Sequence, residues 1–493
     1  MAWVSRCLTA LLAAALSCAP PAAYAQFENL PRLGDAGAED LAPGTERRIG
    51  ETIVRDLRRQ GVIHDDPELT DYLNRFALDL TSTAPAAGYS FEFFLVLDNT
   101  LNAFALPGGY IGVHTGLIVA AQSESEMAGV LAHEIGHVTQ RHIARMLARD
   151  RQSSVLMLAA LVLSALAARS NPQAGIGIAS LGTTMYQQQM LSFSRDAERE
   201  ADRIGFDILR QGGFDTNGMV GFFGRLQQAG RLYENNAPEY LRTHPLTSER
   251  IADIQSRVGA SRYKQRPDSF DFVLARAKLR ALSDTSVDGL RLTQAVFERQ
   301  MRERTIDENA GRFGLATVFA AQRDAAGARR LLAELRRRLP DGHPFIARLA
   351  VQVEIEAGDL AAAATLLSDA RKRFPASRAL LHQQARVLLA QHDFRGAVAT
   401  LEEALTAYRS DPEIWRLLAE AYGGLGQPAR AHRTAAEQFV LLGALPAAIE
   451  QLRMAQRAGR QLDFYVASQV DARLRELEAQ WRYEREEQAA GRR

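Results

Sequence analysis

Two histidines and a glutamate stand in the order H-E-x-x-H, as His133, Glu134 and His137. Side chains four residues apart on a helix lie on one face, so both imidazoles can bind the same metal ion. The glutamate between them is placed to act as a general base that takes a proton from water. The motif therefore predicts a metal-dependent peptidase in which Glu134 is catalytic. The alternative is a helix with two surface histidines, because a short motif also arises by chance.

This chemistry requires a helix, and the surrounding sequence predicts one. Ser123 and Glu126 form an S-x-x-E capping box at its start, and apolar residues follow at helical spacing. The pattern continues without proline to about Leu147. On such a helix His142 falls off the metal face, so we expect it at the surface. Gly136 either permits a close approach of another backbone or has no packing role.

A second predicted helix carries two acidic residues four positions apart, Glu198 and Asp202, and ends before Gly212. Catalytic zinc sites commonly combine two histidines with one glutamate and leave a position for water. A further carboxylate often orients a ligand histidine through its other ring nitrogen. We therefore predict that His133, His137 and Glu198 bind one Zn²⁺ per chain, and that Asp202 is catalytic by orienting a ligand or handling protons. The alternative is a solvent-exposed face of i,i+4 ion pairs.

The order H-E-x-x-H followed by E-x-x-x-D resembles the zinc metallopeptidases that include HtpX and the CAAX prenyl protease. Residues 102–110 and 115–117 also resemble the strand before the metal helix in that family, and the resemblance covers about residues 45–260. It implies a zinc metalloendopeptidase, a hydrolase of peptide bonds.

Residues 91–97 and 110–114 predict two strands, with a turn at residues 107–109. An edge strand near the metal could hold an extended substrate by backbone hydrogen bonds. The alternative is a structural hairpin without a binding role.

His244 precedes Pro245, which disfavours a helical conformation at the histidine. A histidine fixed in a loop could reach the metal as a fourth ligand. The resemblance implies that this histidine caps the zinc and keeps the enzyme inactive until it moves. The alternative, compatible with the first, is a loop in which Pro245 starts the next helix. Arg250 is a further candidate, as a residue that stabilises an oxyanion.

The first 25 residues have the features of a secretory signal peptide, with an apolar run at residues 8–16 and cleavage predicted after Ala25. Both cysteines, Cys7 and Cys18, lie inside this segment. We therefore expect a periplasmic protein without cysteines after cleavage. The alternative is a lipoprotein signal that uses Cys18.

Residues 155–168 carry no charge, but they are fewer than the roughly 20 apolar residues that a spanning helix needs. Together with the glycine-rich residues 171–182 they predict either a lid with peripheral membrane contact or an ordinary core helix and its connection. The chain has 59 basic and 58 acidic residues, and the predicted signal peptide holds one of the basic ones. This balance argues against nucleic-acid binding, which normally shows a basic surplus.

The sequence beyond about residue 270 is rich in Ala, Leu and Arg and repeats itself. Four polar residues recur at intervals of 35, 34 and 34: Asp324, Asp359, Asp393 and Gln427. Apolar residues keep the same register: Ala328, Ala363, Ala397 and Ala431, and Leu332, Leu367 and Leu401. Pro340 and Pro375 are 35 apart and are expected to end helices. A period of about 34 residues predicts tetratricopeptide helix pairs, which stack into solenoids that bind protein partners.

The predicted fold is mostly α. It comprises a signal peptide at residues 1–25, an α+β zinc metallopeptidase domain at 26–265 with a small sheet, an all-α tetratricopeptide domain at 270–480 and a polar tail at 481–493. The resemblance extends to periplasmic family members with such repeats. It implies that the chain assists assembly of outer-membrane beta-barrel proteins, contacts their assembly machinery and degrades misfolded clients. The alternative function is a periplasmic chaperone or adaptor that acts through its repeats and has a latent peptidase domain.

Overall fold

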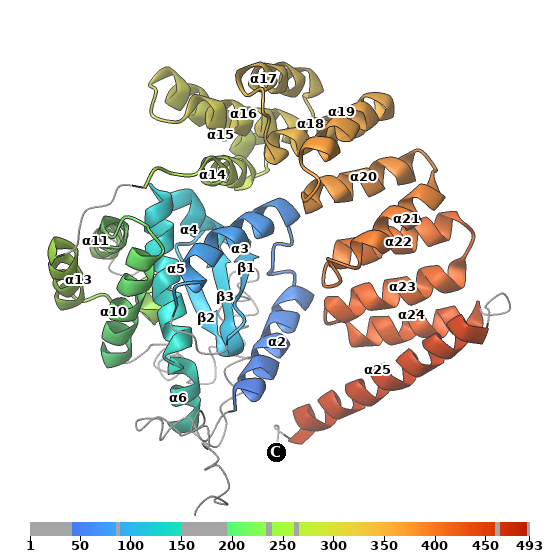
Figure 1. Ribbon diagram of the computed structural model, residues 1–493, viewed down its shortest axis with the longest axis horizontal. Helices are drawn as coiled ribbons and strands as arrows, with labels where there is room; N and C mark the ends of the chain where they lie inside the picture. The colour runs from blue at the N-terminus through green and yellow to red at the C-terminus, as the bar shows by residue number, and fades with distance from the viewer. Residues whose placement is uncertain are drawn as a thin grey trace, which may run out of the picture.

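The computed structural model describes residues 42–84, 89–149, 195–232, 239–260, 266–458 and 464–490. The predicted signal peptide at 1–25 and the segments 155–168 and 171–182 lie outside the described residues. The structure combines a small sheet and its helices with a long series of helix pairs (Figure 1). The predicted fold class is therefore confirmed. Among the described helices, none has both the length and the apolar character needed to cross a membrane.

Among the residues described, the N-terminal half contains three strands, nine α-helices and one short 3-10 helix. In chain order these elements are α2 (Pro43–Arg59), α3 (Pro67–Thr81), β1 (Glu92–Val96), β2 (Ala103–Leu106), the short 3-10 helix η1 (Pro107–Gly109), β3 (Tyr110–His114), α4 (Thr115–Ala120), α5 (Glu124–Thr139), α6 (His142–Arg149), α10 (Arg195–Gln211), α11 (Asn217–Leu232), α12 (Glu239–Thr243) and α13 (Ser248–Ala260).

The strand order in the sheet is β1-β3-β2, with β3 parallel to β1 and antiparallel to β2. Alternate side chains of a strand face opposite sides of a sheet. Phe93 and Leu95 of β1 pack in the cluster that includes α3 and α5, whereas Phe94 and Val96 pack against α2. The sheet is thus covered on both faces, and β2 is an edge strand in contact with α5.

The predicted turn joins β2 to β3 through η1, where Gly108 and Gly109 have φ angles of 77° and 91°. The hairpin partner of β3 is therefore β2 and not the strand within residues 91–97, because a tight turn connects two antiparallel strands that are consecutive in the chain. β1 is instead parallel to β3, and β2 intervenes between them in the sequence.

Helix α5 carries the H-E-x-x-H motif and begins as predicted. The Ser123 side chain accepts a hydrogen bond from the Glu126 backbone N–H at 3.2 Å. The expected continuation to about Leu147 is wrong, because Arg141 adopts a left-handed φ of 54° and the chain turns there before α6. The guanidinium of Arg141 pairs with Glu46 of α2, which is buried and holds the turn.

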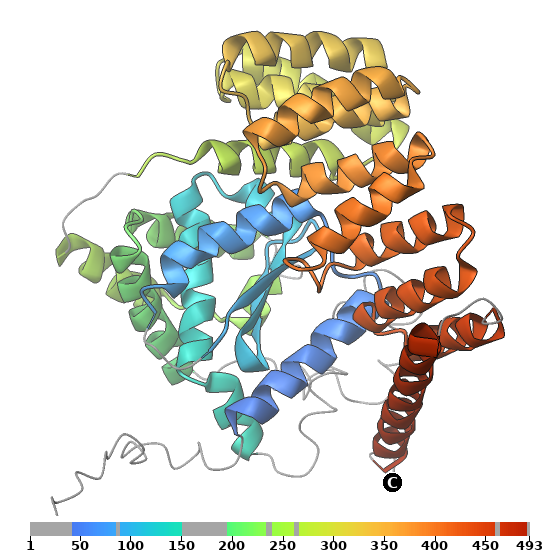
Figure 2. The same cartoon turned by 45° about the vertical axis from the view of Figure 1, so that its right-hand side comes forward.

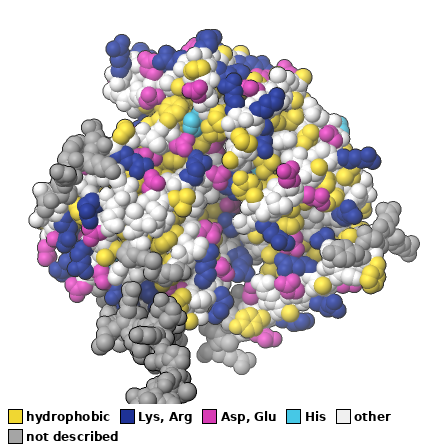
Figure 3. Space-filling view, viewed as in Figure 1, with side chains coloured by type: hydrophobic (Ala, Val, Ile, Leu, Met, Phe, Trp, Pro, Cys, Tyr) yellow, Lys and Arg dark blue, Asp and Glu magenta, His cyan; other side chains and the backbone are white. Residues whose placement is uncertain are grey.

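The C-terminal half is a solenoid of helices that curves around the α2 and α3 side of the sheet (Figure 2). Its elements are α14 (Phe270–Leu282), α15 (Val287–Arg302), α16 (Glu308–Ala321), α17 (Ala325–Arg338), α18 (Pro344–Glu356), α19 (Leu360–Arg373), α20 (Arg378–Ala390), α21 (Phe394–Ala404), α22 (Pro412–Gly424), α23 (Pro428–Leu441), α24 (Leu445–Arg457) and α25 (Phe464–Ala490). Basic and acidic side chains are interspersed over the face shown in Figure 3.

The repeat register has a structural cause at the start of each second helix. Asp324, Asp359 and Asp393 are the N-caps of α17, α19 and α21, and each side chain accepts a backbone N–H three residues later. Gln427 occupies the equivalent position before α23 without a side-chain cap. The alanines that follow at Ala328, Ala363 and Ala397 are fully buried where helices approach. The predicted tetratricopeptide architecture is thereby confirmed.

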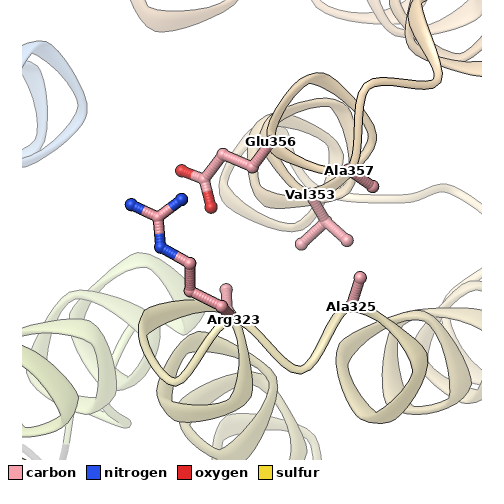
Figure 4. Close-up of a pocket in the computed structure, with 6 residues that line it drawn as sticks. Arg323, Ala325, Val353, Glu356 and Ala357 are labelled. Carbon is pink, nitrogen blue, oxygen red and sulfur yellow. The ribbon is translucent and has the colours of Figure 1, made fainter.

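Small hollows lie between helices of the described solenoid. One of 60 Å³ adjoins the α16–α17 turn and the end of α18, where Arg323 and Glu356 point toward each other (Figure 4). Another of 170 Å³ lies between α17, α18 and α19. The residues that line them come from the repeats and include none of the predicted metal ligands.

Buried ion pairs connect the solenoid to α3. Lys278 of α14 is 2% exposed, and its Nζ lies 2.7 Å from both Asp66 Oδ2 and Glu68 Oε2 at the start of α3. Arg348 of α18 also reaches Glu68, with its Nε 3.2 Å from Oε2. The first solenoid helices therefore contact the peptidase half through buried ion pairs as well as through a common apolar core.

A second group of charges lies farther along the solenoid. Arg378 of α20 contacts Asp71 of α3 at 2.7 Å and Asp411, the N-cap of α22, at 3.0 Å. His382 Nε2 donates to the same Asp411 oxygen, 3.0 Å away. At the C-terminal end, residues 481–490 continue α25 rather than forming a separate tail, and Glu484 pairs with Arg55 of α2 at 3.3 Å.

Candidate metal centre

Four side chains that are distant in the sequence meet in the interior of the N-terminal half. They are His133 and His137 from α5, Glu198 from α10 and His244 directly after α12, and each is at most 1% exposed. One potential ligand atom from each lies within 4.8 Å of all the others. Three imidazoles and one carboxylate in this arrangement form a donor set typical of zinc.

The separations within the cluster are short. His137 Nε2 is 3.0 Å from His133 Nε2 and 3.4 Å from Glu198 Oε1. His244 Nδ1 is 3.0 Å from Glu198 Oε1 and 3.4 Å from His133 Nε2. The structure thus brings together the three predicted metal ligands and the predicted fourth one.

Close packing between α5 and α10 positions the glutamate. A Cβ atom on Gly136 would lie 2.8 Å from the Ala201 carbonyl oxygen, and one on Gly205 would lie 2.9 Å from His133 Cα. Such distances are shorter than ordinary van der Waals contact, so both positions need glycine. Of the two alternatives for Gly136, the structure supports the close backbone approach.

Asp202 lies one helical turn beyond Glu198 and contacts the outer nitrogen of a ligand histidine. Its Oδ1 is 2.9 Å from His133 Nδ1. Arg250 donates to both oxygens of Asp202, from Nε at 2.7 Å and Nη2 at 2.8 Å. Burial lowers the pKa of His133, but its hydrogen bonds to Asp202 and Glu198 outweigh burial and raise that pKa to about 9. The same carboxylates favour a metal cation among the imidazoles.

Arg250 has its donors directed at neighbouring protein groups. In addition to the Asp202 contacts, Nη1 lies 2.7 Å from Glu198 Oε2 and donates to the Pro245 carbonyl at 2.8 Å. The expectation that Arg250 stabilises an oxyanion is therefore not supported, because the guanidinium contacts the carboxylates and the His244 loop.

Glu134 is fully buried beside the cluster. Its Oε1 lies 3.5 Å from His244 Nε2, and neither of its oxygens has a hydrogen-bond partner among the residues that the structure describes. Burial raises the pKa of this carboxyl above its usual value. A buried carboxylate that accepts no hydrogen bond is costly, so its retention here indicates a role with a molecule from outside the chain.

The loop after α12 presents His244 to the cluster. The backbone N–H of His244 still donates to the Tyr240 carbonyl at 2.8 Å, and the two rings stack with centroids 4.6 Å apart. Pro245 does not start the next helix, since α13 begins at Ser248. His244 is thereby fixed as the last residue of a helical turn, with its ring directed inward.

The expected surface position of His142 is wrong. It is 4% exposed, and its Nδ1 lies 2.8 Å from Nδ1 of His137. On a continuous helix the two side chains would diverge, but the left-handed turn at Arg141 redirects the chain and brings His142 back. The local sequence gives no signal for this turn, because the contact that holds it comes from α2.

Comparison with known proteins agrees with this geometry. Residues 64–258 match peptidase family M48, and residues 354–421 and 388–439 match the tetratricopeptide repeat. The beta-barrel assembly-enhancing protease of Escherichia coli K12 is 31% identical over 457 residues, which cover 93% of each chain. The putative beta-barrel assembly-enhancing protease of Vibrio cholerae is 33% identical and covers 85% of this chain and 86% of its own.

A relative without the full-length match is the mitochondrial metalloendopeptidase OMA1 of Schizosaccharomyces pombe. It is 30% identical over 247 residues, which cover 49% of this chain and 69% of its own. The shared part is therefore about half of this chain, whereas the bacterial relatives match nearly all of it. The chain belongs to peptidase family M48 and is a metalloendopeptidase with tetratricopeptide repeats.

Proposed function

We propose that the chain is a zinc-dependent endopeptidase in which His133, His137 and Glu198 bind the metal. The observation that carries this proposal is the convergence of these three side chains beside the buried carboxylate of Glu134, which has no hydrogen-bond partner among the described residues. Zinc bound there would supply Lewis acidity toward the scissile carbonyl and toward water. Glu134 accepts the proton from the attacking water and returns it to the leaving amine.

Asp202 acts on the metal centre through His133. A neutral imidazole that binds metal through Nε2 carries its hydrogen on Nδ1, and an Asp202 oxygen lies 2.9 Å from this nitrogen, within reach to accept that hydrogen. Because both Asp202 oxygens also hold Arg250, its contribution is orientation of the ligand. The proton-handling alternative is less well supported by these contacts.

His244 serves as a fourth, regulatory ligand in the resting enzyme. With four protein donors around one ion, no position remains for water and substrate. Withdrawal of His244 then opens the site, and the loop at Pro245 is the element that must move. We infer a resting enzyme of low activity that a client or partner switches on.

The edge strand β2 is the proposed binding site for an extended substrate. It lies at the edge of the sheet and contacts the helix that carries Glu134. Backbone pairing along an edge strand reads conformation more than sequence. This selectivity suits a protease for unfolded segments.

The full-length relatives are named for enhancing beta-barrel assembly. We propose that this chain likewise acts in the periplasm, after cleavage following Ala25, on unfolded or misassembled outer-membrane beta-barrel proteins. The solenoid would bind these clients or their assembly machinery, and the peptidase would degrade clients that stall. Nucleic acid is not an expected partner.

The test uses the purified chain without residues 1–25 and its Glu134→Gln variant. We expect about one zinc per wild-type chain by elemental analysis, cleavage of an unfolded protein by wild type, and retained zinc without cleavage in the variant. Wild-type protein without zinc would refute the metal centre. Full complementation of a cellular assembly defect by Glu134→Gln would instead favour the chaperone or adaptor alternative.

The regulatory role of His244 has a separate test. His244→Ala should increase the rate of proteolysis, because it removes the fourth donor and leaves the three proposed metal ligands. A variant with normal zinc content and no gain in proteolysis would refute the capping role and leave the peptidase assignment intact.

A further inference from the structure

His142 occupies the place where a metal-ligating histidine normally meets a carboxylate or carbonyl oxygen. Its Nδ1 lies 2.8 Å from Nδ1 of His137, and its Nε2 lies 3.0 Å from Glu200 Oε2. Arg145 donates to the same Glu200 oxygen at 2.8 Å. These contacts form a continuous path from His137 to a carboxylate on another helix.

We propose that His142 is a positioning residue for His137, and that it relays the orienting effect of Glu200 to the metal centre. The inference rests on the proposed role of His137 as a metal ligand. It assigns to His142 and Glu200 on one side of the cluster what Asp202 does on the other.

The direction of each hydrogen bond in the relay follows from metal binding. His137 directs Nε2 into the cluster, so a neutral His137 carries its hydrogen on Nδ1 and donates it to His142 Nδ1. His142 must then accept at Nδ1 and carry its own hydrogen on Nε2, which donates to Glu200. Arg145 keeps that carboxylate in place. The four groups therefore select one tautomer of His137, with its metal-binding lone pair directed inward.

The fold is built to make this relay. The turn at Arg141, held by Glu46, is what returns His142 to His137 after α5 has ended. Glu200 lies on α10, the helix that also supplies Glu198. The relay thus joins α5, α6 and α10 around one ligand.

Both histidine ligands are connected to a carboxylate outside the cluster, His133 directly and His137 through one intervening residue. His133 leads directly to Asp202 and then Arg250, all buried. His137 leads through His142 to Glu200 and Arg145, whose side chains are 30% and 45% exposed. Each path ends on a carboxylate paired with an arginine. This correspondence is expected of ligand orientation and is not explained by packing alone.

The experiment measures zinc affinity by competition with a chromogenic chelator, independently of proteolysis. His142→Leu removes the acceptor for His137 and should weaken zinc binding by about 10- to 100-fold. His142→Asn can place its Oδ1 near the original Nδ1 and should retain affinity close to that of wild type. Glu200→Ala changes a partly exposed side chain, so it should fold normally and weaken zinc binding in the same direction.

His382→Leu is the matched control, because His382 is also 4% exposed and contacts a carboxylate, on Asp411, but lies in the solenoid. It should lower stability without changing zinc affinity. Equal affinity of His142→Leu and wild type, or equal losses in His142→Leu and His142→Asn, would overturn the relay alone. Wild-type protein that binds no zinc would overturn the metal centre and the relay together.

Discussion

The close approach of α10 to α5 makes Gly205→Ala a direct test of how the metal centre is assembled. An added Cβ would lie 2.9 Å from the Ala132 carbonyl carbon, the Ala132 oxygen and His133 Cα. All three are backbone atoms, so no side-chain rotation can relieve the overlap. The two helices must instead move apart.

The size of that movement follows from contact distances. Carbon atoms pack best at about 3.5–4.0 Å, so the helices should separate by roughly 0.6–1.1 Å at this point. Overpacking of this kind costs about 1–3 kcal/mol, whereas alanine gains about 1 kcal/mol over glycine in a helix. The expected net change is a loss of about 1 kcal/mol in the free energy of unfolding.

The effect on the site should be larger than the effect on stability. Glu198 and Asp202 lie within two turns of Gly205 on the same helix, and metal ligands tolerate displacements of only about 0.2 Å. A misplacement near 1 Å can cost about 100-fold in rate. We therefore expect zinc affinity and proteolysis to fall by one to two orders of magnitude.

Gly224→Ala on α11 provides the matched control, because a Cβ there would meet no atom within 4 Å. It should raise stability by about 1 kcal/mol without changing zinc affinity. Chelator competition and urea unfolding of both variants measure the two quantities. If Gly205→Ala is also stabilised and binds zinc like wild type, the idea that glycine sets the helix spacing is refuted.

Three further substitutions test contacts outside the cluster. Lys278→Met leaves the buried Asp66 and Glu68 without their shared cation, and should lower the free energy of unfolding in urea by about 3 kcal/mol. Burial raises the pKa of Asp411, but the neighbouring imidazole and guanidinium outweigh burial and lower it overall. Asp411 therefore stabilises the fold above about pH 4, and this contribution is lost as the pH falls through its lower folded-state pKa, so Asp411→Asn should flatten the pH dependence of unfolding below about pH 4. His392 has a left-handed φ of 60°, which glycine adopts without the strain of a side chain, so His392→Gly should raise the free energy of unfolding by about 1 kcal/mol.

Each expectation has a contrary result. Exposed Lys372→Met should change stability by less than about 0.5 kcal/mol, and an equally small loss in Lys278→Met would show that the buried bridge is not important. An unchanged acid unfolding profile in Asp411→Asn would exclude the proposed linkage. Gly358 has a φ of 78° at the equivalent turn, so Gly358→Ala should destabilise, and destabilisation by His392→Gly as well would contradict the strain argument.

The sequence was sufficient for features that depend on spacing within one element. The four-residue intervals in α5 and α10 predicted which side chains share a face, and the capping pattern located the start of α5. The recurring aspartates predicted the repeat register because each caps a second helix. In every such case the cause lies within a few residues of the signal.

Features set by distant contacts were not predictable in the same way. The end of α5 depends on Arg141 and on Glu46, which lies 95 residues earlier. His142 was therefore assigned to the wrong environment, since helical periodicity describes a helix that continues. The order of the strands likewise depends on the antiparallel pairing of β3 with β2 and its parallel pairing with β1. The composition of the individual strands does not specify this pairing.

The boundary between the halves shows the same limit. By its sequence α14 belongs to the repeats, yet its buried Phe272, Leu274 and Leu279 pack in one apolar cluster with α3 and α5. In a solenoid each helix pair buries its faces against its neighbours, and the first pair needs a cap. Here α3 and α4 contact α14 in that position, and Lys278 neutralises the carboxylates at the start of α3. The peptidase half therefore acts as the N-terminal cap of the solenoid, so the change in sequence pattern near residue 270 does not coincide with a break in the core.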